Sequence, residues 1–206
     1  NVLENFVFHL GLIEMISYWK LACPQELVVE ACPLTIGSKK FMEDLFLHGL
    51  GEFYYVNKID FTIQKFLTIT SLSVAVAGPI EIDTKPTDLV LVGGGKDSAL
   101  LLSLLTKSNR TIQPLVINPS VAALEIIKAL HLTPIVVTRT MDPKVKELNA
   151  QGYLNGHTPF SALLSFLGVM VAAMNGYEHV IVANEQSANE GNVMYKGVEI
   201  NHQYSK

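Results

Sequence analysis

The sequence predicts an α/β fold in which a parallel sheet carries helices on both faces and a small α+β domain precedes it. From residue 88 onward, short apolar runs alternate with longer segments of helical periodicity. This alternation is typical of parallel sheets built from strand–helix–strand units. Residues 1–80 mix helical and strand-like segments, and the polar stretch 81–87 follows Gly78-Pro79. We therefore expect domains at 1–80 and 88–206, joined by a linker at 81–87.

The N-terminal domain is expected to combine helices with short strands. Apolar residues at helical spacing predict a helix over residues 1–22. Ser38 is a candidate N-cap for a second helix, which stops near Gly49. Strand candidates are rich in β-forming residues and comprise 27–30, 61–70 and 72–77. The last two are expected to form a hairpin.

The second domain is expected to alternate strands and helices. Its strand candidates are residues 89–92, 115–117, 134–138 and 179–183. Its helix candidates are residues 98–106, 120–130, 142–150 and 158–176. Asp142 is a suitable N-cap, because Pro143 follows it at the first helical position. Ligands of such sheets bind outside the carboxyl ends of the strands.

Composition excludes several classes of protein. The chain has 206 residues, of which 49% are hydrophobic and 17% charged, and this describes a globular protein with a sizeable core. A net charge of −4 and a pI near 5.9 argue against nucleic-acid binding. The longest apolar run, 160–174, is too short to span a bilayer, so no membrane partner is expected. Cys23 and Cys32 form neither a disulfide framework nor a four-ligand zinc site, which indicates the cytoplasm.

The glycine run 93–95 joins the predicted strand 89–92 to a predicted helix. Backbone N–H groups in such a turn can approach a phosphate, and the helix dipole favours negative charge there. A Walker A loop is excluded, because Asp97 stands where Ser or Thr is required and Val90 stands at the upstream glycine position. A dinucleotide fingerprint fits poorly, because Ser98 holds the third glycine position. We interpret the run as a nucleotide site, with a turn that only packs a helix on a strand as the alternative.

Further polar residues gather where predicted strands end or helices begin. Asn118 follows the second strand of the sheet, and His157 precedes the long apolar helix. Glu185 and Glu190 lie in the polar loop 184–192 after the last strand. Loops at such positions commonly carry function. The alternatives are an exposed turn for the loop 184–192, and for His157 a cap of the following helix or a side chain that faces solvent.

The glycine run and its neighbours resemble the PP-loop of ATP pyrophosphatases. That loop has the pattern Ser-Gly-Gly-x-Asp-Ser, and here Gly93-Gly94-Gly95-Lys96-Asp97-Ser98 departs from it only by Gly93 at the first position. With the segments 155–159, 184–192 and 201–206, the chain is similar to the UDP-N-acetylmuramoyl-L-alanyl-L-glutamate epimerases of peptidoglycan synthesis. Segments 3–14 and 49–53 also resemble that family's first domain. Members are longer, so we expect the chain to be a fragment without the C-terminal part.

The resemblance implies an ATP- and Mg²⁺-dependent isomerase. Its small-molecule substrate would be the UDP-linked muramoyl dipeptide, whose terminal L-glutamate becomes D-glutamate through an acyl-adenylate, with release of AMP and PPi. In such an enzyme Gly93, Gly94, Gly95 and Ser98 would hold the phosphates, and Lys96 would point at them or at solvent.

The remaining roles follow from the same resemblance. Asp97 would help to hold Mg²⁺, which prefers oxygen ligands. Asn118 would lie where adenosine passes. His157, Glu185 or Glu190 would transfer the proton or supply a second metal ligand, and the motif that contains His202 and Lys206 is left without a role.

Other interpretations stay open. The chain could belong to another PP-loop adenylating enzyme, amidating or thiolating, or to a non-catalytic nucleotide-binding module. Cys23 and Cys32 could form a racemase thiol pair, although a packing role is the stronger expectation.

Overall fold

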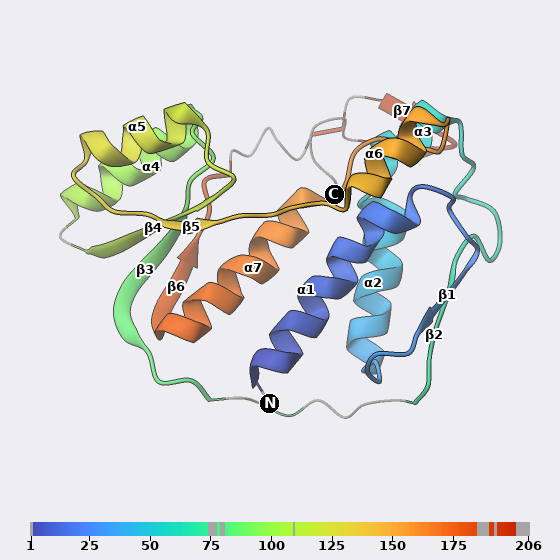
Figure 1. Ribbon diagram of the computed structural model, residues 1–206, viewed down its shortest axis with the longest axis horizontal. Coiled ribbons are helices and arrows are strands. Elements are labelled where there is room, and N and C mark those ends of the chain that lie inside the picture. Colours follow the sequence, from blue (N-terminus) through green and yellow to red (C-terminus); the bar gives the residue numbers. More distant parts are fainter. Residues whose placement is uncertain are drawn as a thin grey trace. The chain divides into compact units, whose positions relative to one another are not determined.

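The computed structural model describes residues 2–73, 78, 81–108, 110–184, 190–191 and 193–200 (Figure 1). The chain divides into two compact units. The first unit comprises Asn1–Ile80, Asp142–Leu163 and Ser187–Lys206, and the second comprises Glu81–Met141 and Leu164–Gln186. The break between residues 80 and 81 agrees with the expected end of the first domain, but residues 142–163 and 187–206, which were expected in the second domain, group with the first unit. Leu154, Val198 and Ile200 pack into the core of the N-terminal segment, and this packing assigns their parts of the chain to the first unit.

The first unit contains helices and two small two-stranded sheets. Its helices are α1 (Val2–Trp19), α2 (Ile36–His48), α3 (Gly51–Asn57) and α6 (Pro143–Ala150). Its strands are β1 (Glu26–Val29), β2 (Thr68–Ser71), β7 (Val193–Tyr195) and β8 (Val198–Ile200). β1 pairs with β2 in parallel, and β7 pairs with β8 in antiparallel orientation. The α+β character expected of this part of the chain is confirmed.

Aromatic side chains form the core of the first unit. The ring of Trp19 meets that of Phe46 edge-on, with 4.8 Å between centroids. Tyr54 is fully buried, and its hydroxyl donates to the carbonyl of Phe46 at 2.6 Å. Burial raises the pKa of Tyr54, because the charged phenolate would lose its hydration. α1, α2 and α3 are thus fixed to one another by large apolar side chains.

Two local expectations for this unit were wrong. Thr35, not Ser38, caps α2, because the Thr35 side chain accepts from the backbone N–H of Ser38 at 2.9 Å. The expected hairpin of 61–70 and 72–77 is not formed by its described part, since β2 pairs with the distant β1. Residues 74–77 lie outside the described residues.

The described part of the second unit forms a four-stranded parallel sheet with the order β5-β4-β3-β6. Its strands are β3 (Lys85–Leu91), β4 (Thr111–Ile117), β5 (Ile135–Val137) and β6 (Tyr177–Ile181). Its helices are α4 (Lys96–Lys107), α5 (Val121–Ala129) and most of α7 (Phe160–Asn175). The predicted α/β class, with its parallel sheet flanked by helices, is confirmed.

Alternate residues of the central strand serve the two faces of this sheet. Val90 belongs to a buried cluster with Leu102 of α4 and Ile127 of α5. Leu91 faces α7, where a Cβ on Gly168 would lie 3.2 Å from its Cδ1 atom. Figure 1 shows α4 and α5 on one side of the sheet and α7 on the other. Among the helices described, none has the length and apolar content needed to cross a membrane.

A buried carboxylate on β3 marks the amino-terminal half of the sheet. Asp88 is 1% exposed and accepts from Arg110 through both carboxylate oxygens, one of them from Nη2 at 2.6 Å. Nδ1 of His179 lies 3.1 Å from Asp88 Oδ1. The Arg110 guanidinium holds the pKa of Asp88 below its usual value. Gly93 follows five residues later, roughly 16 Å along an extended chain, so the cluster stabilises the strand rather than the loop.

Candidate nucleotide-binding loop

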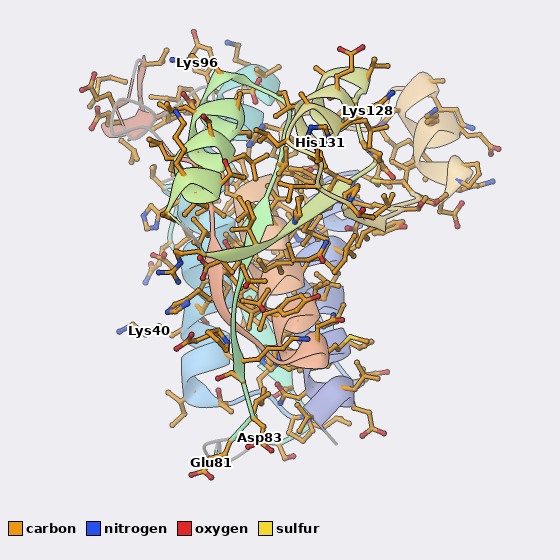
Figure 2. All side chains as sticks on the ribbon, turned by 90° about the vertical axis from the view of Figure 1, so that its left-hand side faces the viewer. Lys40, Glu81, Asp83, Lys96, Lys128 and His131 are labelled. Atoms are coloured by element: carbon orange, nitrogen blue, oxygen red, sulfur yellow. The ribbon has the colours of Figure 1, made fainter. Side chains whose placement is uncertain are left out.

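The glycine run lies at the carboxyl end of the central strand. The chain passes from β3 to β4 and β5 on one side of β3, and then crosses to β6 on the other side. The loop after β3 therefore lies at the switch point of the strand order, where open α/β sheets bind ligands. Figure 2 shows Lys96 at the opposite end of this unit from Glu81 and Asp83, which precede β3. A cationic side chain thus stands at the binding edge.

The start of α4 has the features of an anion site. Gly95 is the N-cap residue, and it offers no side chain that could bind the first N–H groups of the helix. These groups have no partner within a helix, and together with the helix dipole they attract anions. The oxygens of a phosphate fit this arrangement.

The glycines of the run differ in whether a side chain would fit at their positions. Gly94 has a φ of +92°, and a Cβ there would lie 2.8 Å from Ser120 Oγ and 2.9 Å from the Ala123 nitrogen. Glycine is therefore required for the loop to pack against the start of α5. A Cβ on Gly95 would meet nothing within 4 Å, so the backbone at Gly95 is open to a ligand.

Ser98 joins the start of α4 to the first residue of the glycine run by a hydrogen bond. Its side chain is buried at 8% exposure, and its Oγ accepts from the Gly93 N–H at 3.1 Å. A hydroxyl that accepts one hydrogen bond can still donate its own proton to a phosphate oxygen. A Cβ on Gly93 would lie 4.0 Å from Ser98 Oγ. The serine of the PP-loop pattern would therefore fit at position 93.

Lys96 and Asp97 are the charged residues of the loop. Lys96 Nζ lies 3.8 Å from Asp97 Oδ1, and their side chains are 79% and 43% exposed. Within the described ranges, no group of three or more His, Cys, Asp and Glu side chains could hold a metal. One carboxylate fits Mg²⁺ that is bound chiefly by substrate phosphates and water. The assignment of Asp97 as a magnesium ligand stays a prediction.

Asn118 joins the ends of two strands. Its Oδ1 accepts from the Arg139 N–H at 2.9 Å, and its Nδ2 donates to the Arg139 carbonyl at 2.8 Å. Its φ of +43° is one that asparagine tolerates better than most residues. The structure thus gives the Asn118 side chain a role in shaping the edge after β4 and β5. Its contact with adenosine stays a prediction.

The residues proposed for proton transfer are not part of the loop 93–98. His157 belongs to the first unit, where its Nδ1 lies 3.6 Å from Oε2 of Glu52. Glu190 is exposed and also groups with the first unit. Glu185, His202 and Lys206 lie outside the described residues. The structure brings the loop residues 93–98 together with Asn118 in the second unit, and it brings His157 to Glu52 in the first.

Sequence reasoning missed two residues beside His157. Glu52 is its ionic partner, and Lys20 donates to the carbonyls of Gly156 and His157. The Lys20 contacts join residues 136 and 137 positions apart. Only the burial of Lys20 could have drawn attention to it, and burial is not visible in a sequence.

The two cysteines have different environments. Cys23 is half-buried, packs against the core of the first unit and has its pKa raised to about 11 by burial. Cys32 is exposed. A packing role is therefore confirmed for Cys23 and wrong for Cys32.

Comparison with known proteins identifies the family. The sequence matches the family described as "MurL N-terminal domain" over residues 1–206. It is 34% identical over 198 residues to proteins of Micromonospora sp. and Salinispora tropica, and 30% identical over 197 residues to one of Xanthomonas oryzae pv. oryzae. All three are named UDP-N-acetyl-alpha-D-muramoyl-L-alanyl-L-glutamate epimerase.

These matches cover 96% of this chain but only 43–44% of the relatives. A solved structure of a predicted tRNA methyltransferase subunit from Methanocaldococcus jannaschii aligns with 21% identity and a TM-score of 0.35, over 54% of this chain and 59% of that one. The match of the family over the full chain decides the assignment. The chain belongs to the MurL N-terminal domain family.

Proposed function

We propose that this chain supplies the ATP-binding part of an enzyme that converts the terminal L-glutamate of UDP-N-acetylmuramoyl-L-alanyl-L-glutamate to D-glutamate during synthesis of peptidoglycan precursors. The observation that carries the proposal is the open glycine loop 93–95 at the switch point of the sheet, in a chain whose relatives are named as this epimerase. The chain spans less than half of those relatives, so the activity is assigned to the whole protein.

The chemistry explains why ATP is needed. The α-carbon of the terminal glutamate carries a carboxylate, and removal of its proton would place a second negative charge beside the first. Transfer of AMP to that carboxylate forms an acyl-adenylate and releases PPi. The adenylate has lost the carboxylate charge, so a side-chain base can take the Cα proton. Hydrolysis then yields AMP and the D-glutamyl product and makes the inversion effectively irreversible.

Each loop residue would make a different contact with the triphosphate. N–H groups of the glycine run and the start of α4 would bind phosphate oxygens, and Ser98 would donate its hydroxyl proton. Lys96 would offset phosphate charge. Asp97 would hold Mg²⁺, which neutralises the phosphates when bound.

Product analysis tests the proposal. The full-length protein is incubated with ATP, Mg²⁺ and the UDP-linked dipeptide, and nucleotides and glutamate enantiomers are then quantified. AMP, PPi and D-glutamate that depend on the dipeptide are the expected result. AMP without D-glutamate would indicate a different adenylating enzyme, amidating or thiolating. ATP binding without turnover would indicate a non-catalytic module, and ADP as product would contradict the assignment of the loop.

A further inference from the structure

A cavity of about 330 Å³ opens in the first unit between α2 and β8. Its lining comes from the last turns of α2, from Gly51 and Phe61 and from β8, all of which belong to the first unit. The nucleotide loop lies in the second unit, so the proposed function gives this cavity no role. We propose that the cavity binds a small amine, in which a short apolar body carries one ammonium group.

The most deeply buried residues of the lining are apolar and belong to the core of the first unit. Phe61 is 5% exposed and Ile200 is 3% exposed. The ring of Phe61 stacks on that of Tyr54, with 4.7 Å between centroids, and the Tyr54 hydroxyl donates to the carbonyl of Phe46. Apolar, preformed walls of this kind are typical of small-molecule sites, because little has to be ordered when the ligand binds.

Two contacts fix the wall that β8 gives to the cavity. A Cβ on Gly51 would lie 3.0 Å from Ile200 Cγ2, so the start of α3 and the end of β8 are in close contact. In the turn between β7 and β8, Lys196 Nζ lies 3.0 Å from Oδ2 of Asp60, the neighbour of Phe61. The hairpin is therefore attached near both ends of β8.

The rim of the cavity carries carboxylates from both walls. Asp44 of α2 and Glu199 of β8 supply one each, and the described residues that line the cavity include no lysine or arginine. Asp44 Oδ1 lies 2.9 Å from His48 Nδ1, and Glu199 Oε1 accepts from the Gly191 N–H at 3.0 Å. Because His48 can neutralise only one of the two carboxylates, the lining as a whole stays negative in either protonation state of the imidazole.

This charge selects the class of ligand. A molecule that fills the cavity removes water from the rim, and a carboxylate that loses water without gaining a cation is costly. An ammonium group has three N–H donors and forms charge-assisted hydrogen bonds with carboxylates. A carboxylic acid would be repelled, and an alcohol of the same shape would bind without the electrostatic gain. The volume lies near the lower end of the roughly 300–1,000 Å³ found for ligand sites, so the apolar body is short.

Three probes of similar shape test the charge preference on the full-length protein. Phenethylamine carries the ammonium group, phenethyl alcohol is its neutral counterpart, and hydrocinnamate carries a carboxylate. Ligand-observed NMR titrations at low ionic strength give the Kd of each probe. The amine should bind roughly 3- to 30-fold more tightly than the alcohol, because each exposed ion pair adds only a modest gain. Hydrocinnamate should bind most weakly.

Substitutions on the rim locate the binding. Asp44→Asn and Glu199→Gln remove one charge each but keep an oxygen that can accept the same hydrogen bond. Each should weaken amine binding roughly two- to fivefold and leave the Kd of the alcohol unchanged. Glu43→Gln is the matched control, because Glu43 adjoins Asp44 on α2 but pairs with Lys39 and is not part of the lining. It should change neither Kd.

A variant that fills the cavity gives an independent measurement. Leu47 is half-buried in the lining, and Leu47→Trp would place a larger ring in the cavity. It should weaken the binding of all three probes at least about tenfold, since the probe and the indole would occupy the same volume. If Leu47→Trp does not fold, Asp44→Asn and Glu199→Gln still decide the inference.

Two results would overturn the inference. Equal Kd values for the amine and the alcohol in the unmodified protein would show that the rim does not select a cation. A preference for the amine that survives both Asp44→Asn and Glu199→Gln would place its binding elsewhere on the protein. Neither result bears on epimerisation, so this inference and the proposed function are tested separately.

Discussion

Two substitutions one residue apart, Gly94→Ala and Gly95→Ala, are expected to separate folding of the nucleotide loop from its function. Both replace glycine by the smallest side chain with a Cβ. At position 94 the new methyl group would meet Ser120 and Ala123 below 3 Å, whereas at position 95 it would meet nothing within 4 Å. The first change should therefore damage the fold, and the second should damage nucleotide binding.

The magnitudes follow from the backbone and the contacts. Alanine at the Gly94 φ of +92° is strained by about 1–3 kcal/mol, and the overlap with α5 adds about 1–3 kcal/mol. Gly95 has a φ of −85° and a ψ of 176°, which alanine adopts without strain. Gly95→Ala should change the free energy of unfolding by no more than about 1 kcal/mol, because the gain from a less flexible unfolded chain opposes the poorer fit of alanine at the N-cap of α4. Its methyl group stands where a phosphate would approach, so the Kd for ATP should rise at least about tenfold.

Urea unfolding and calorimetric titration with ATP measure the two effects on the full-length protein. Gly93→Ser is the matched control, because its Cβ would lie 4.0 Å from Ser98 Oγ and the serine restores the PP-loop pattern. It should unfold and bind ATP like the unmodified protein. The reasoning is refuted if Gly94→Ala unfolds at the original urea concentration, or if Gly95→Ala binds ATP with unchanged affinity.

Three further outcomes are expected. Arg110 lowers the pKa of Asp88, so this carboxylate stabilises the folded protein above about pH 4, and the stabilisation is lost as the pH falls through the lowered pKa. In Arg110→Met the urea midpoint should therefore fall less between pH 5 and pH 3 than in the unmodified protein. With a thiol reagent at pH 8, the exposed Cys32 should react quickly and Cys23 slowly, because burial raises the pKa of Cys23 to about 11. In Cys32→Ser the fast phase of the thiol reaction should be absent. Asp97→Ala should lower ATP turnover sharply. Full ATP turnover in this variant would contradict the assignment of Asp97 to the nucleotide site.

The sequence predicted the sheet well because its signals are local. Apolar runs marked the strands, and Asp142 and Pro143 marked the start of α6, where the structure confirms the cap. The start of β3 was placed too late, because Asp88 is polar in sequence yet buried through its pairing with Arg110. α3 is only 7 residues long, too short to show a helical period.

The candidate site also combines a feature that local sequence predicts with contacts between distant segments that it does not predict. The glycine run could be recognised from six consecutive residues, because its geometry depends on a strand, a turn and a helix that adjoin in sequence. The pairing of Glu52 with His157 depends on the folding of distant segments against α3. The hydrogen bonds from Lys20 to Gly156 and His157 join residues 136 and 137 positions apart. The periodicity of apolar residues in the sequence contains no information on such contacts.

An oxygen-transfer experiment tests the central claim most directly. The dipeptide substrate is prepared with ¹⁸O in the α-carboxylate of its terminal glutamate and is incubated with the full-length protein, ATP and Mg²⁺. An acyl-adenylate that water cleaves at the acyl carbon leaves one ¹⁸O atom in the AMP. Mass spectrometry should therefore show AMP with one ¹⁸O, in step with D-glutamate formation. D-glutamate formed with unlabelled AMP, or with no AMP, would contradict the account.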